Sequence, residues 1–185
     1  MSMVNLVKAT MENWEEAYEV FYRSLRKLIS EGTDELFGGM DRDRTKQSIQ
    51  GNNSMYLLRR EGDKIPVVAI SVLRKEEYDE YEDVLTAAFQ TAKIPTKKVV
   101  LLNAIACRPE LQGQGYARQA VALLREELKK EGVEVVVCIA HPDNRPGQST
   151  LVDMSKDNAL FTSKEYTWKT PSGRQLERAR FAFFI

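Results

Sequence analysis

The amino-acid sequence predicts an α/β (α+β) fold, in which helices pack on a sheet that contains both antiparallel and parallel strand pairs. Two observations support this prediction. Apolar runs typical of strands occur as neighbours separated by a short polar turn, and one further pair of such runs is separated by an amphipathic helical pattern. The length of 185 residues suits one domain with a substantial core, so we expect residues 1–185 to form a single domain.

The N-terminal part predicts a strand followed by a helix. Met3–Ala9 is β-prone, and Thr10 belongs to the residue types that cap helices, so we expect the helix to begin directly after it. The helical pattern has one apolar face and ends before Gly32. The apolar residues of this face are Trp14, Ala17, Tyr18, Phe21, Leu25 and Leu28.

A short helix and a hairpin are expected next. Asp41 or Asp43 is placed to cap the short helix. Ser54–Arg60 and Ile65–Leu73 are apolar runs typical of strands, and the polar stretch Glu61–Lys64 between them is typical of a hairpin turn. These two runs therefore predict an antiparallel pair in the sheet.

The middle of the chain leads to the strand that we expect at the centre of the sheet. An acidic stretch, Glu76–Asp83, precedes a helical pattern that Pro95 closes. Val99–Cys107 follows as a nearly continuous apolar run, which is typical of a strand that is covered on both faces.

A turn that contains glycines and then a helix follow this strand. The helix ends before Gly132, and Val133–Ala140 is a second apolar run of the buried type. Strand, helix and strand together predict a βαβ unit with two parallel neighbours. The helix has apolar residues at Ala117, Ala120, Val121, Leu123, Leu124 and Leu128.

The C-terminal part predicts a short helix within Asn144–Asp157 and then two strands, Leu160–Trp168 and Gln175–Ile185, joined around Pro171 to Gly173. The last strand is rich in aromatic residues, which either belong to the core or form a homodimer interface. These residues are Phe181, Phe183 and Phe184.

Composition excludes several classes of protein. The 27 basic and 27 acidic residues balance, so we expect no nucleic-acid partner. The start of the chain does not have the pattern of a secretion signal and the apolar runs are too short to cross a bilayer, so we expect a cytoplasmic protein without a membrane partner. Cys107 and Cys138 lie in apolar runs and are expected to be buried thiols, and their separation from the single histidine predicts no metal site.

The most informative stretch is the turn between the central strand and its helix, Arg108–Ala117. Gly113 and Gly115 allow backbone N–H groups to converge on one point, and the helix N-terminus adds about half a positive charge there. These features predict a ligand that carries a phosphate, while the alternative is that the glycines only make the turn. The stretch lacks the lysine and hydroxyl of a P-loop and the glycine spacing of a dinucleotide fingerprint.

Gln112-x-x-Gly115-x-Ala117 resembles the Gln/Arg-x-x-Gly-x-Gly/Ala signature of the GNAT N-acetyltransferases. Leu102–Pro109 looks like the strand before the signature in that family, and Val133–Asn144 looks like the strand after it. The order of elements is similar along nearly the whole chain. The resemblance implies the GNAT-like acyl-CoA N-acyltransferase fold, with a central mixed, mostly antiparallel twisted sheet and helices on both faces.

The resemblance also implies that acetyl-CoA is the co-substrate and that a primary amine of a small molecule or peptide takes the acetyl group by direct attack in a ternary complex. In the family, the strands ending near Cys107 and Cys138 splay apart, and the pantetheine arm pairs with the backbone of Ile105 and Cys107. Asn144 would bond pantetheine and Arg118 would meet a phosphate. The pyrophosphate would bind Gln112, Gly113, Gln114, Gly115, Tyr116 and Ala117.

Candidates for the acid and base are weaker. The backbone N–H of Cys107 is the expected oxyanion donor. Asn103 stands where many members carry a Glu or His base, and its neutral amide can orient a water but cannot be a base. The tyrosine acid that members often carry after Asn144 is missing here, which leaves water or a polar side chain of that segment. These side chains are Ser149, Asp153 and Ser155.

Other polar residues have two interpretations each. His141 is either a general base or a loop residue, and Cys107 is either a nucleophile paired with His141 or a buried structural thiol. Tyr166 reaches the site only if the last hairpin folds toward it. The acidic stretch Glu76–Asp83 is either a solvated helix face or a surface that attracts a cationic acceptor.

The absence of an evident acid and base leaves a second function open, which is a non-catalytic module of the GNAT fold that binds or senses acyl-CoA. A nucleotide-binding protein that uses the same glycine turn is a third hypothesis. Binding of ATP without binding of CoA would distinguish it from the other two.

Overall fold

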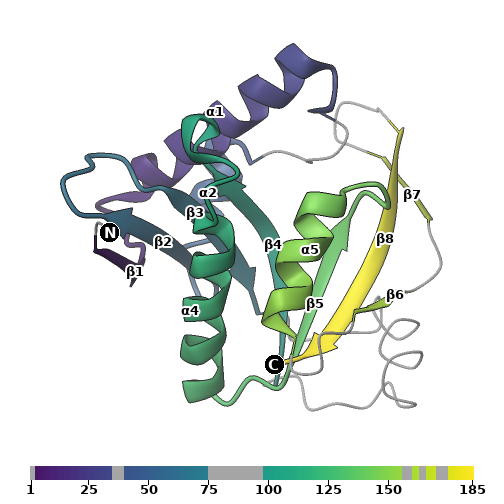
Figure 1. Ribbon diagram of the computed structural model, residues 1–185. Coiled ribbons are helices and arrows are strands. Elements are labelled where there is room, and N and C mark those ends of the chain that lie inside the picture. Colours follow the sequence, from purple (N-terminus) through teal and green to yellow (C-terminus); the bar gives the residue numbers. More distant parts are fainter. Residues whose placement is uncertain (1–2, 35–39, 75–97, 156–159, 163–165, 170–174) are drawn as a thin grey trace.

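The computed structural model describes residues 3–34, 40–74, 98–155, 160–162, 166–169 and 175–185. The acidic stretch at 76–83, the helical pattern that Pro95 closes and the turn around 171–173 lie outside these residues. Figure 1 shows the arrangement of the described elements, with α4 and α5 in front of the sheet and α1 behind it.

The described strands form a mixed sheet in the order β1-β2-β3-β4-β5-β8-β6, and β7 pairs with β8 off this path. Only β4 and β5 among them are parallel, and the other pairs are antiparallel, as the sequence predicts. The strands are β1 (Val4–Lys8), β2 (Ser54–Arg60), β3 (Val68–Leu73), β4 (Val99–Cys107), β5 (Val135–Ala140), β6 (Phe161–Thr162), β7 (Tyr166–Lys169) and β8 (Gln175–Phe184).

The helices begin and end at recognisable caps. Asp41 accepts a hydrogen bond from the Arg44 N–H at 2.8 Å and caps α2, and Gly32, at φ 70°, ends α1 in the left-handed region. The described helices are α1 (Trp14–Glu31), α2 (Arg42–Gln47), the 3₁₀ turn η4 (Pro109–Leu111), α4 (Tyr116–Lys130) and α5 (Arg145–Met154).

The prediction that Thr10 caps the first helix is wrong. The N-cap is Asn13, and its Oδ1 accepts a hydrogen bond from the Thr10 N–H at 2.8 Å. The Thr10 hydroxyl accepts from the Glu12 N–H at 3.3 Å, so Thr10 stabilises the turn that precedes the helix.

The described core has clusters on both faces of the sheet, and a smaller third cluster joins β4, β5 and β8 through Val99, Val135 and Ala182. α1 contributes Val20 and Phe21 to a cluster with Leu57 of β2 on one face. On the other face, Leu124 of α4 and Met154 of α5 join the larger cluster. The helices therefore cover both faces, which confirms the predicted architecture.

The C-terminal strands differ in detail from the prediction. The expected strand Leu160–Trp168 is two short strands, β6 and β7, and each pairs with β8. Of the aromatic residues of β8, Phe181 and Phe183 are buried in the core, whereas Phe184 is 38% exposed. Among the described residues, no helix is both long and apolar enough to cross a membrane.

Candidate functional site

A β-bulge divides the central strand β4. The register between β3 and β4 passes from the pair Ser71–Ala104 directly to Val72–Leu102, so Asn103 is the extra residue. A bulge bends its strand and changes the direction of the side chains that follow. Asn103 is exposed, although it lies in the middle of an otherwise apolar strand.

β4 and β5 separate at the same place. Their parallel pairing ends at Leu102–Cys138, while β4 continues to Cys107, and Figure 1 shows the two strands diverging from there. The Arg108 N–H donates to the Val67 carbonyl at 2.9 Å, and hydrogen-bonded residues alternate along an antiparallel pair. The backbone groups of Ile105 and Cys107 therefore face away from β3, toward the side that β5 has left. We call this side of residues 103–107 the open edge.

The glycine turn follows the open edge directly. Gly113 has φ 77° and Gly115 has φ 83°, and a side chain is strained at either position because both lie in the left-handed region. Gly115 is the N-cap of α4, and the first bond of the helix runs from the Gln119 N–H to the Gly115 carbonyl at 3.0 Å. The N–H groups of residues 116–118 precede this bond and have no partner within the helix. The turn can therefore receive an anion.

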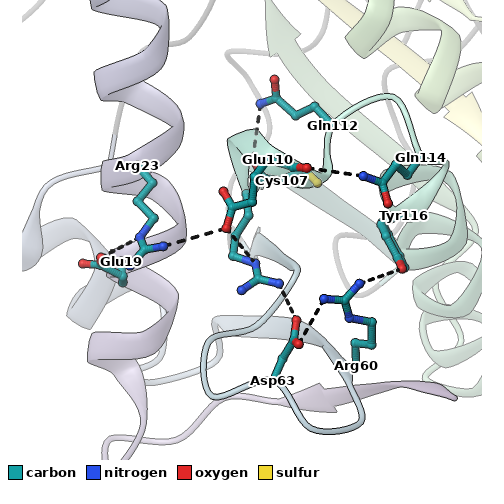
Figure 2. Close-up of polar contacts among 10 residues, drawn as sticks. Glu19, Arg23, Arg60, Asp63, Cys107, Glu110, Gln112, Gln114 and Tyr116 are labelled. Atoms are coloured by element: carbon teal, nitrogen blue, oxygen red, sulfur yellow. Dashed lines mark hydrogen bonds and ion pairs between the residues drawn. The ribbon is translucent and has the colours of Figure 1, made fainter. Parts of the chain in front are cut away.

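Partly buried charges support the turn from the β2–β3 hairpin, as Figure 2 shows. Asp63 accepts hydrogen bonds from Arg60, at 3.1 Å, and from Arg108, which begins the turn. Arg60 also donates to the Tyr116 hydroxyl at 3.4 Å, so it connects the hairpin to the first residue of α4. Burial acts to raise the pKa of Asp63, but the bonds and charges of Arg60 and Arg108 outweigh it and lower the pKa.

Helix α1 reaches the turn from the opposite face of the sheet. Arg23 bonds Glu19 at 2.7 Å and lies 3.8 Å from Glu110 of η4. Lys27 donates from Nζ to Oε1 of Gln112 at 2.6 Å, and Gln112 in turn donates from Nε2 to the Cys107 carbonyl at 3.3 Å. The Gln112 amide thus lies between Lys27 and the end of the open edge.

The comparison with protein families matches residues 14–150 to the model described as the acetyltransferase (GNAT) family. The chain belongs to this family. It is therefore an acyltransferase by class. The family resemblance that the signature indicated is confirmed over residues 14–150. No curated protein matches the sequence of this acetyltransferase significantly.

Solved structures share the fold of the acetyltransferase. The ribosomal-protein-S18-alanine N-acetyltransferase from Escherichia coli has a TM-score of 0.66 at 17% identity, covering 99% of this chain and 94% of that chain. The ribosomal-protein-alanine N-acetyltransferase from Brucella melitensis has a TM-score of 0.67 at 13% identity, covering 98% and 99%. The yncA protein from Salmonella typhimurium, solved with its cofactor acetyl-CoA, has a TM-score of 0.63 at 13% identity, covering 98% and 93%.

Several predicted site residues of this acetyltransferase lie at the junction of α4 and α5. Arg118 donates to the Ser149 hydroxyl at 3.0 Å and pairs with Asp153 at 2.8 Å, so its guanidinium already has partners. Asn144 is the N-cap of α5, and its Oδ1 accepts from the Gly147 N–H at 3.0 Å. The structure thus gives both residues a role in the protein itself, and their roles toward CoA stay predictions.

The remaining candidates have separate surroundings. His141 accepts a hydrogen bond at Nδ1 from the Asp143 N–H, at 3.1 Å, within the loop before α5. Burial raises the pKa of the Cys107 thiol to about 11 and that of Cys138 to about 12, so both thiols are protonated at neutral pH. Asn103 places Nδ2 3.5 Å from Met40 Sδ and 3.5 Å from Ser71 Oγ, at the limit of hydrogen bonding.

The sequence did not identify three residues that the structure places at the site: Lys27, Arg60 and Asp63. Asp63 lies in a hairpin turn, where an aspartate is common for local reasons. Lys27 contacts Gln112 across 85 positions of sequence, and no local pattern indicates that contact. In the described residues, no cluster of His, Cys, Asp and Glu is arranged to hold a metal ion.

Proposed function

We propose that this acetyltransferase transfers the acetyl group of acetyl-CoA to a primary amine of a small molecule or peptide, by direct attack in a ternary complex. The observation that carries the proposal is the open edge of β4, which leads directly into the signature turn. Strand β4 offers an edge that no described strand covers, and the turn that follows offers N–H groups to an anion. The strand edge suits the pantetheine arm of CoA, and the turn suits its pyrophosphate.

The described residues fit the co-substrate as follows. Ile105 and Cys107 would pair with the amides of pantetheine, since their backbone groups face the side on which no described strand pairs with them. The Cys107 carbonyl already accepts from Gln112 at 3.3 Å, but a carbonyl oxygen has two lone pairs and can accept again. The turn from Gln112 to Ala117 would hold the pyrophosphate. We keep Asn144 as the pantetheine ligand and Arg118 as a phosphate ligand.

The chemistry rests mainly on position. The Cys107 N–H would donate to the thioester oxygen as negative charge develops on it, and such a donor is worth about 3 kcal/mol in comparable sites. The amine must reach the site neutral or lose a proton there. Asn103 would orient the water that takes this proton, because its amide lies at the bulge next to the open edge.

Two further side chains are candidates for a catalytic role. Ser149 and His141 remain candidates for proton transfer, and α5 holds Ser149 against Arg118. We also propose that residues 1–185 form one acetyltransferase domain, since the solved relatives align with 98–99% of the chain.

The test combines calorimetry and turnover on the full chain. Acetyl-CoA is titrated into the protein, and release of free thiol is then followed with a panel of amines, polyamines and basic peptides. Binding with thiol release that depends on an amine supports the proposal. Binding without release for every acceptor favours a module that senses acyl-CoA, and stabilisation by ATP with no binding of acetyl-CoA contradicts both functions.

A further inference from the structure

We propose that Lys27 of α1 is a ligand of the CoA pyrophosphate and supplies the positive charge that the signature of this chain lacks. This inference rests on the proposed function, because it assigns a further residue to the same site. It goes beyond the signature, since Lys27 belongs to a helix on the other face of the sheet from α4.

The position of Lys27 supports the proposal. Its Nζ lies 2.6 Å from Oε1 of Gln112 and 3.7 Å from Glu31, so the signature residue is its nearer partner. The Gln112 amide reaches in the other direction to the Cys107 carbonyl, at the end of the open edge. We infer that a ligand extending from the open edge to the turn would run close to this amide. Lys27 is therefore one side chain away from that path.

The charges around the turn point to the same residue. The first position of the signature takes either Gln or Arg, and this chain has the neutral Gln112 there. The nearby arginines are engaged with carboxylates, Arg108 with Asp63 and Arg118 with Asp153. Lys27 lies 3.7 Å from Glu31, but its shorter contact, at 2.6 Å, is to a neutral amide, and exchanging that amide for a phosphate would pair the ammonium with an opposite charge.

The exposure of Lys27 suits a ligand contact. Its side chain is 35% exposed, so Lys27 is neither buried in the core nor fully surrounded by water. A four-carbon stem also allows the ammonium to move a few ångströms without change in α1. A contact of this kind is weakened by salt, because part of the interaction is screened by ions.

The experiment compares Lys27→Met with wild type by calorimetric titration of CoA and of dephospho-CoA, which keeps the pyrophosphate and lacks the 3′-phosphate. We expect Lys27→Met to lower the affinity for both ligands by about tenfold, which corresponds to the loss of one hydrogen bond to a charged group. Thermal stabilisation by pantetheine, which has no phosphate, should not change. Arg26→Met is the matched control, because it removes a charge from the next position, whose guanidinium lies against Tyr22.

A rescue separates the charge from a structural role. Adding Gln112→Arg to Lys27→Met should restore most of the affinity for both CoA ligands, since the arginine returns the cation to the first position of the signature. The inference is overturned if Lys27→Met binds both ligands as wild type does, or if pantetheine is weakened equally. A loss of affinity for CoA but not for dephospho-CoA would also overturn the inference, because Lys27 would then contact the 3′-phosphate. Failure of the proposed function is a different result, namely that wild type does not bind CoA.

Discussion

The two parts of β4 on either side of Asn103 are both apolar, but they have different roles. Residues 99–102 pair with β5 and are all buried, and Leu101 and Leu102 also pair with β3 on the other side. Residues 104–107 keep the pairing with β3 but lie beyond the end of the pairing with β5. One extra residue, Asn103, separates the halves. The comparison teaches that a single bulge divides a central strand into a part that stabilises the fold and a part that is available to a ligand.

The largest effect on stability should come from truncating a buried side chain in the half of β4 that pairs with β5. Leu102→Ala removes a side chain that is 4% exposed and leaves a cavity, so we expect the free energy of unfolding to fall by about 3 kcal/mol. Ile105→Ala, in the open half, should cost about half as much because Ile105 is only partly buried. Urea denaturation of both variants measures the difference. Equal losses would mean that the bulge does not divide the strand energetically.

The next effect should come from blocking the turn beyond the open half. Gly115→Asp places a carboxylate where the pyrophosphate is expected and strains a residue at φ 83°, so we expect CoA affinity to fall at least about a hundredfold. Gly132→Asp is the matched control, since Gly132 has φ 79° and lies just beyond the other end of α4. Calorimetric titration should show near-normal affinity for the control. Unchanged affinity in Gly115→Asp would place the pyrophosphate elsewhere.

Much of this fold could be predicted because its local signals agree. The run 99–107 and the strand β4 have the same limits, and the glycine turn at Gly115 marks the start of α4. Thr10 was an exception, because two residues that can cap a helix, Thr10 and Asn13, stand close together and the helix begins after the second. Such competition between neighbouring caps has no solution in sequence alone.

The site could be predicted only where glycines and a signature reveal it. The turn at Gly113 and Gly115 could be predicted because glycine is the residue that most readily adopts the positive φ found at both positions. The contacts of Asp63 and Lys27 join segments far apart in the chain, so they depend on the finished packing of the hairpin and α1. The bulge at Asn103 depends on the register with β3, which one apolar run does not specify.

A smaller effect should follow from changing the bulge residue itself. Asn103→Ala removes the amide that we propose to orient a water, so kcat should fall by about tenfold while the KM for acetyl-CoA stays within about twofold. Steady-state kinetics with the best acceptor of the panel measure both constants. Asn103→Asp is the informative partner, because a carboxylate can accept a proton. A rate for Asn103→Ala equal to wild type would contradict the proposed role.

The smallest effect should be at the last residue of the open half, since its proposed contribution comes from the backbone. Cys107→Ala keeps the N–H group, and we expect affinity and kcat to stay within about twofold of wild type.

Burial raises the pKa of the Cys107 thiol to about 11, and the negative Glu110 opposes the lowering effect of Arg108. Alkylation of Cys107 by iodoacetamide should therefore be slow at neutral pH and rise about tenfold per pH unit up to pH about 10, because only the thiolate reacts. Mass spectrometry of the labelled peptide gives the rate. Rapid labelling at pH 7, together with a large loss of kcat in Cys107→Ala, would instead identify the thiol as a nucleophile, and the open half of β4 would then act through a side chain as well as its backbone.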